Sequence, residues 1–246
     1  MRCLTTLFCN SKHVFRDSRF FAVNLHERKR KTTNDKQKAE MKICIFCSAN
    51  EQIDPDFFLA TEQLGRWAAK NGHSIVFGGV NMGLMECVAR AAHEAGGQTI
   101  GVIPSIIEKN GRKSDYVDVE IFCQDLSDRK DLMLAQSDVA VALPGGVGTL
   151  DEVFTQLASA SIGYHHKRVI LYNMKGFWNP LLSMLEAMNS QGVIRSTLRE
   201  HLAVVSSLEE LEQELRVGPL SSPPCRGKPS AQEASPTGGG LVGANS

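Results

Sequence analysis

Short apolar runs alternate with segments of helical apolar spacing from residue 41 onward. The runs, bounded by Gly, Pro or polar residues, predict β-strands, and the segments with a period near 3.6 residues predict helices. Strands are predicted at 43–47, 74–77, 99–103, 117–122, 139–143, 169–172 and 203–205. Helices are predicted at 55–71, 84–95, 127–136, 149–161, 180–188 and 208–215, with a polar loop at 108–115. This alternation indicates an α/β fold, a doubly wound parallel sheet in a single domain, with ligands bound at the carboxyl ends of the strands.

The two ends of the chain differ from this regular part. Residues 1–40 have no sustained period and hold ten Lys or Arg against four Asp or Glu. We interpret them as a basic, disordered extension, with Met41 as a candidate start, and a mitochondrial transit peptide is the alternative. Residues 217–246 are rich in Pro, Gly and Ser and are expected to form a disordered tail. The folded domain is therefore predicted at 41–216.

Composition narrows the function classes. Beyond residue 40 the chain has 17 Lys or Arg and 23 Asp or Glu, and such a mildly acidic body argues against general nucleic-acid binding. No apolar run approaches the roughly 20 residues of a membrane span. The seven cysteines, an odd number, lie partly in apolar runs, as reduced thiols of an intracellular protein do. Cys44 and Cys47 have the spacing of a metal pair, but no second Cys or His pair accompanies them. We interpret both as core residues on opposite sides of a strand.

The most informative segment is 144–152, Pro-Gly-Gly-Val-Gly-Thr-Leu-Asp-Glu, directly after a predicted buried strand. Its glycines let the backbone approach a ligand closely, and the free N–H groups of the helix that follows favour a phosphate. A second glycine turn, Gly-Gly-Val-Asn-Met-Gly at 78–83, also follows a predicted strand. Alone it is a weak signal, but two glycine turns at neighbouring strand ends could line one crevice.

Two charged residues stand out near these turns. Glu152 lies beside the phosphate cradle, where an acidic group could be catalytic, but Thr149 and Glu152 also have the spacing of a capping box. Arg129 lies three residues after Leu126 and four before Met133, on the inward line of its helix. A charge on that line requires an anionic partner, although a solvated charge pair at a helix start is the alternative.

Together these residues resemble the LONELY GUY (LOG) family over about 41–216. The motif at 144–152 is preceded by Asp-Arg-Lys at 128–130 and by Gly-Gly-x-x-x-Gly-Leu-Met at 78–85. Family members are cytokinin riboside 5′-monophosphate phosphoribohydrolases, often mislabelled lysine decarboxylases, with a Rossmann-like fold. The resemblance implies hydrolysis of the N-glycosidic bond of a nucleoside 5′-monophosphate, a cytokinin riboside 5′-monophosphate or AMP, to free base and ribose 5-phosphate. It implies no metal and no organic cofactor, and we expect a cytoplasmic homodimer.

The resemblance assigns Arg129 and Glu152 as the catalytic residues. The loop glycines and Thr149 match the phosphate site, Lys130 and Met133 the base and ribose side, and Ser48 a turn near the nucleotide. The implied substrate-binding residues are Ser48, Gly79, Lys130, Met133, Gly145, Gly146, Gly148 and Thr149. The chain departs from the family at Val80 and Glu86, where glycine is common, and at 47–49, which reads Cys-Ser-Ala rather than Cys-Gly-Ser. These changes crowd the first turn and bear on base preference.

The chemistry leads to one mechanistic hypothesis. The 5′-phosphate rests on the N–H groups of 145–149, and Glu152 stabilises the positive charge developing on the ribose or orients the attacking water. Arg129 neutralises substrate charge or positions Glu152. The rival class is a non-catalytic nucleotide-binding module, which would not require Arg129 and Glu152 together. Nothing marks a Lys for a pyridoxal phosphate Schiff base, so lysine decarboxylation is disfavoured.

Overall fold

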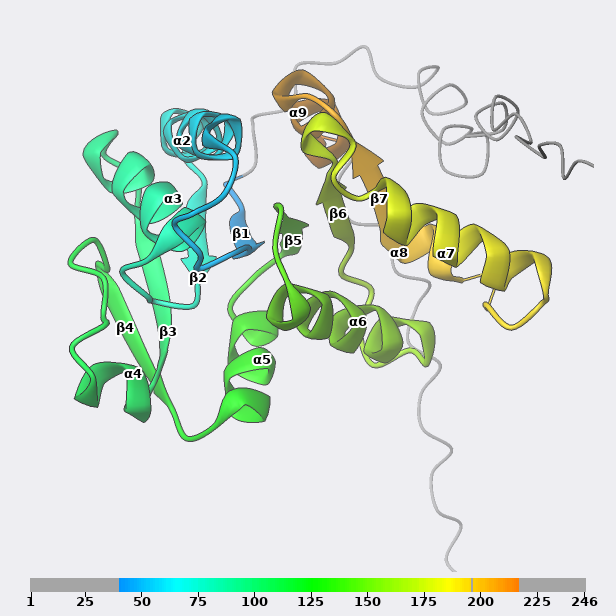
Figure 1. Ribbon diagram of the computed structural model, residues 1–246. Helices are drawn as coiled ribbons and strands as arrows, with labels where there is room; N and C mark the ends of the chain where they lie inside the picture. The colour runs from blue at the N-terminus through cyan, green and yellow to red at the C-terminus, as the bar shows by residue number, and fades with distance from the viewer. Residues whose placement is uncertain (1–39, 196, 217–246) are drawn as a thin grey trace, which may run out of the picture.

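The computed structural model describes residues 40–195 and 197–216 (Figure 1). The expectations for residues 1–39 and 217–246 therefore lie outside the described residues. Within the described part, seven parallel strands form one sheet in the order β4-β3-β2-β1-β5-β6-β7. The strands are β1 (Lys42–Phe46), β2 (Ser74–Phe77), β3 (Thr99–Pro104), β4 (Val119–Cys123), β5 (Val139–Ala142), β6 (Val169–Tyr172) and β7 (Leu202–Val205). Strand β1 lies in the centre of the sheet, and the later strands extend it outward in both directions, which confirms the predicted α/β class.

Helices cover both faces of this sheet. One face carries α2 (Pro55–Lys70), α3 (Gly83–Glu94) and α9 (Leu208–Arg216). The other carries α5 (Leu126–Ala135), α6 (Val147–Ser161), α7 (Asn179–Ser190) and α8 (Leu198–His201). The remaining short elements are α4 (Ser105–Lys109) and the 3-10 helix η2 (Met174–Gly176). None of the helices in the described part of the chain could span a membrane.

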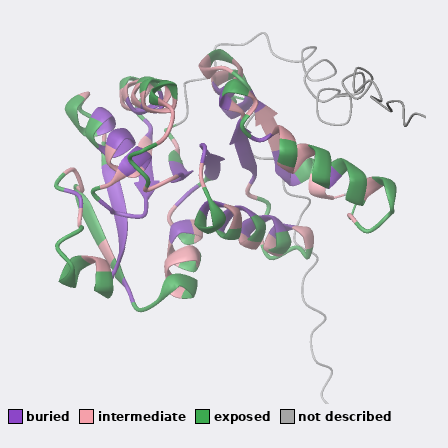
Figure 2. Cartoon of the chain, in the orientation of Figure 1, coloured by how far each residue is buried: buried purple, intermediate pink, exposed green. Residues whose placement is uncertain are grey.

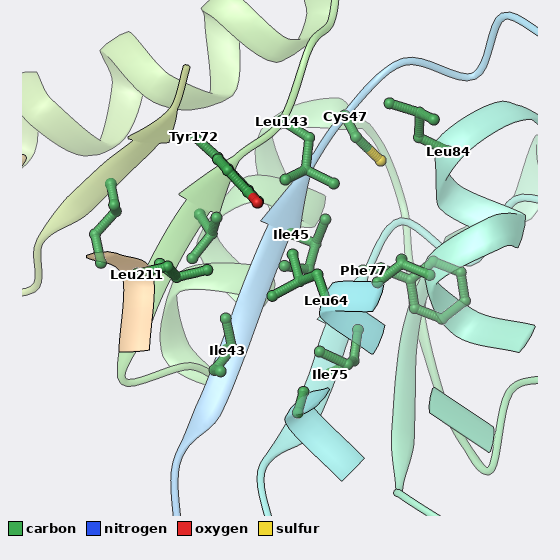
Figure 3. Close-up of a cluster of buried hydrophobic side chains, with 14 of the residues drawn as sticks. Ile43, Ile45, Cys47, Leu64, Ile75, Phe77, Leu84, Leu143, Tyr172 and Leu211 are labelled. Carbon is green, nitrogen blue, oxygen red and sulfur yellow. The ribbon is translucent and has the colours of Figure 1, made fainter. Parts of the chain in front are cut away.

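The sheet separates two apolar clusters, and the central strand contributes to both. Ile43, Ile45 and Cys47 pack with α2, α3 and α9 on one side (Figure 3), whereas Cys44 and Phe46 face the other. The central strands form the buried core of the molecule, whereas the edge strand β4 is largely exposed (Figure 2). The cysteines among the described residues are free, and burial raises the pKa of the Cys44 and Cys47 thiols well above the usual value. The interpretation of these two cysteines as core residues is confirmed.

The structure departs from the predicted elements where the segments are short. Helix α4 begins immediately after β3 and runs into the segment predicted as a polar loop at 108–115. Helix α8 was not predicted, because a four-residue helix shows no apolar period. Helix α6 begins at Val147 rather than Thr149, and this earlier start changes the geometry of the glycine loop.

Candidate functional site

Three turns meet at the carboxyl edge of the sheet. The Ser48 N–H donates to Pro144 O at 3.1 Å, and Ser48 O accepts from the Leu84 N–H at 2.9 Å. The sequence led us to expect the two glycine turns on neighbouring strands. They are not on neighbouring strands, because β1 lies between β2 and β5. Ser48 joins them through its backbone, while its Oγ accepts from the Asn50 N–H at 3.0 Å and shapes its own turn.

The glycine loop after β5 opens directly into α6. Gly146 is the N-cap without a side-chain cap, and the first intrahelical bond runs from the Leu150 N–H to Gly146 O at 3.0 Å. The N–H groups of 147–149 precede that bond, as the free donors of a helix start do. Gly146 and Gly148 are exposed, and Val147 is 83% exposed. This exposed helix start is suited to an anionic group.

The predicted capping box is wrong. Thr149 lies inside α6 rather than at its cap, because the helix starts two residues earlier. Its side chain is buried against the loop: a Cβ placed on Gly145 would lie 2.1 Å from Thr149 Oγ1. The glycine at 145 is thus required by the neighbouring threonine. Glu152, in the second turn of α6, is free to make a different contact.

That contact is an ion pair with Arg129 on α5. Arg129 Nη1 lies 3.0 Å from Glu152 Oε1, and the two side chains are only 11% and 6% exposed. The alternative of a solvated charge pair is excluded for Arg129. The inward line on which it was predicted is wrong at one end, however: Leu126, the first residue of α5, is 64% exposed. Arg129 points inward because a carboxylate meets it there, not because it follows an apolar stripe.

The same guanidinium lies against the second glycine turn. A Cβ on Gly78 would lie 1.6 Å from Arg129 Nη2, so any side chain at residue 78 would require this guanidinium to move. Arg129 Nε is buried and has no hydrogen-bond partner within the described residues. Arg129 therefore brings the turn after β2 and the helix after β5 together at one point.

Burial dominates the electrostatics of Glu152. Burial raises the pKa of this carboxyl, Arg129 opposes the shift and Asp151 adds to it, and the resulting pKa is about 7. A carboxyl with a pKa near 7 exchanges its proton readily at neutral pH, as a general acid or base must. A perturbed carboxyl beside an exposed helix start is typical of a catalytic site.

A second ion pair lies beside the first. Lys130 Nζ contacts Asp151 Oδ1 at 2.9 Å and Oδ2 at 2.8 Å, and Thr155 Oγ1 at 3.1 Å. The sequence analysis missed Asp151 and Thr155, although their spacing of four residues places both on one face of α6. Adjacent residues on α5 thus bind adjacent residues on α6.

Two predicted site residues lie in packed positions. Gly79 has φ +70°, and a Cβ there would lie 2.5 Å from Ile103 Cγ1. Backbone conformation and packing therefore explain the glycine at this position. Met133 is 1% exposed and belongs to the apolar cluster beneath α5 and α6. Their contact with a substrate stays a prediction. No group of His, Cys, Asp and Glu among the described residues could hold a metal ion.

Comparisons with known proteins identify relatives of this chain. Residues 85–215 match the family model described as "possible lysine decarboxylase". The chain is 34% identical to probable cytokinin riboside 5′-monophosphate phosphoribohydrolase LOGL2 of Oryza sativa subsp. japonica, covering 71% of each chain. It is 33% identical to cytokinin riboside 5′-monophosphate phosphoribohydrolase LOG3 of Arabidopsis thaliana, covering 73% of this chain and 84% of the relative. Among solved structures it is similar to the molybdenum cofactor binding protein of Rippkaea orientalis, with 28% identity and a TM-score of 0.55 over 74% of this chain and 98% of the other.

Proposed function

The chain belongs to the LOG family of phosphoribohydrolases, and from this premise we propose that it hydrolyses the N-glycosidic bond of a nucleoside 5′-monophosphate. The substrate is a cytokinin riboside 5′-monophosphate, AMP or both, and the products are free base and ribose 5-phosphate. The observation that carries the proposal is the buried Arg129–Glu152 pair, whose carboxylate belongs to the second turn of α6, the helix that starts with free N–H groups. Binding alone would not require that pair.

Each part of the site has a task in this reaction. The 5′-phosphate lies on the N–H groups of 147–149, which fixes the ribose relative to α6. Glu152, ionised, takes a proton from the attacking water and faces the positive charge that develops on the ribose ring. The base leaves with the electron pair of the broken bond and takes up a proton from the solvent, while the oxygen of the attacking water stays on the ribose. Arg129 contacts the Glu152 carboxylate at 3.0 Å, so its main task is to orient Glu152 as the general base.

Release of free base tests the proposal. Purified protein is incubated with isopentenyladenosine monophosphate and, separately, with AMP, and the free base is separated by chromatography. We expect release from at least one of them and loss of release in Glu152→Gln, while a fluorescent nucleotide still binds the variant. The ratio of the two rates gives the preferred base. Release that persists in Glu152→Gln would show that this carboxyl is not the catalytic group.

A carrier without catalysis is the second candidate. It is supported by the similarity to the molybdenum cofactor binding protein of Rippkaea orientalis, at 28% identity. Binding of a phosphorylated ligand without base release from either nucleotide would favour this function over hydrolysis.

We also propose that the protein forms a homodimer through α6 and α7. Both helices cover the same face of the sheet and carry apolar side chains on their outer surfaces: Phe154 is 36%, Met184 47% and Met188 39% exposed. Exposed apolar side chains favour burial against another chain. Sedimentation of the purified protein tests this, and a dimer that Met184→Asp does not weaken would point to another interface.

We further propose a cytoplasmic location. The support is the free state of the cysteines in the described part of the chain, which fits a reducing compartment. Imaging of a fluorescent fusion at the C-terminus, with and without residues 1–40, tests it. Mitochondrial signal that disappears with residues 1–40 would identify a transit peptide instead.

A further inference from the structure

The ion pair between Lys130 on α5 and Asp151 on α6, the outer ion pair, has no task in the mechanism above. It nevertheless has more contacts than a single surface ion pair. Lys130 Nζ contacts both carboxylate oxygens of Asp151 and the hydroxyl of Thr155. Its side chain is only 18% exposed, whereas that of Asp151 is 52% exposed. Three acceptors on α6, two from Asp151 and one from Thr155, therefore hold the lysine.

This arrangement decides which cation Glu152 meets. Arg129 and Lys130 are neighbours on α5, and Asp151 and Glu152 are neighbours on α6, so the four charges pair in parallel rather than crosswise. Without Asp151, nothing on α6 would hold Lys130 except Thr155, and Glu152 would be the nearest carboxylate on that helix. A second cation on Glu152 would keep it ionised and make it a weaker base.

We propose that Asp151 is a positioning residue: it holds Lys130 on Thr155 and away from the Arg129–Glu152 pair, so that Glu152 remains basic enough to take a proton from water. The role rests on the proposed hydrolysis, but the contact can be tested without it. The groups that face Glu152 are Arg129 and Lys130 from α5, Asp151 on its own helix, and Cys44 and Cys47 from β1. Burial keeps both thiols neutral at pH 7, so the balance depends on the three charged side chains.

The experiment measures the protonation of Glu152 directly. Protein labelled with ¹³C in the glutamate side chain is titrated without nucleotide, and the Glu152 carboxyl signal is identified by its absence in Glu152→Gln. We expect Asp151→Asn to lower the titration midpoint by on the order of one pH unit, because it removes a negative charge and frees a positive one. Lys130→Gln should raise the midpoint, and the double variant should return close to the wild-type value. Thr155→Val, which changes no charge, should leave the midpoint within a few tenths of a unit.

The pH dependence of base release gives the second readout. In Asp151→Asn the acid limb of kcat/KM should shift downward together with the titration midpoint, and the plateau of kcat should fall several-fold, since a weaker base transfers the proton less well. An unchanged midpoint in Asp151→Asn, or an equal change in Thr155→Val, would overturn the proposal. Midpoints that shift as expected in a protein that releases no base would support the role of Asp151 and reject the hydrolase function.

Discussion

The guanidinium of Arg129 occupies the space that a side chain at residue 78 would need. A Cβ on Gly78 would lie 1.6 Å from Nη2 and 2.8 Å from Cζ of Arg129. The absence of a side chain at Gly78, directly after β2, therefore leaves the space in which the Arg129 guanidinium of α5 lies. Glu152 in turn depends on that charge, because Arg129 is its 3.0 Å partner.

Gly78→Ala should inactivate the enzyme without unfolding it. The added methyl group displaces Arg129, and a misplacement of about 1 Å in a catalytic array can lower the rate about 10²-fold. We expect kcat/KM for base release to fall by about that factor. Far-UV circular dichroism should match the wild type, which separates displacement of Arg129 from misfolding. Activity within threefold of the wild type would mean that Arg129 does not need its present position.

Base release should increase with pH through neutrality. In the proposed mechanism Glu152 acts as a base only when it is ionised, and burial raises its pKa to about 7. The acid limb of kcat/KM should therefore have its midpoint near pH 7, well above the usual range of a glutamate. Rates measured from pH 5 to 9 in buffers of constant ionic strength check this. A limb near pH 4.5 would show that the carboxyl is solvated in the free enzyme.

Stability should change with pH in the opposite direction. Because the folded state raises the Glu152 pKa from 4.5 to about 7, it binds the proton more tightly than the unfolded chain does. The stabilisation is fully present below pH 4.5 and is lost as the pH rises through 7. Between pH 5 and 8 the wild type should lose about 2–3 kcal/mol of unfolding free energy that Glu152→Gln does not lose. Urea unfolding of both proteins at the two pH values measures the difference, and parallel pH curves would refute it.

Two glycines of the loop before α6, the proposed phosphate site, should respond differently to alanine. Gly145→Ala forces the methyl group against Thr149 Oγ1, at 2.1 Å, and should destabilise the protein. A Cβ on Gly148 meets nothing within 4 Å, and alanine favours a helical position by about 0.5 kcal/mol. Gly148→Ala should thus be slightly more stable while its KM for nucleotide rises, since the methyl group obstructs approach to the N–H groups. Thermal melts and KM values on both variants test this contrast.

The sequence predicted the sheet and most of its helices because buried parallel strands are short, continuous apolar runs. The positions of Arg129 and Glu152 in one site could be proposed from a motif, but their contact could not, since they are far apart in sequence and meet only through packing of α5 on α6. The capping box failed for a local reason. The glycine at 146 ends the loop earlier than spacing indicated, and spacing alone does not distinguish a cap from a second-turn residue.

The boundary at residue 216 makes a final prediction about what the domain requires. Helix α9 contributes Leu211 and Leu215, which are 0% and 4% exposed, to the core. Glu214 pairs with Arg168 at the start of β6, and its carbonyl accepts from Arg168 Nη2 at 2.9 Å. A chain of residues 41–216 should therefore unfold at the same temperature as the full chain. A chain ending at residue 207 loses two core leucines, at about 2–5 kcal/mol each, and leaves a buried arginine without its carboxylate. That loss is comparable to the whole stability of a domain, so the shorter chain should not fold. Thermal melts of the full chain, the chain of residues 41–216 and the chain ending at residue 207 test this prediction. If the chain ending at residue 207 melts cooperatively at the temperature of the full chain, the domain boundary lies elsewhere.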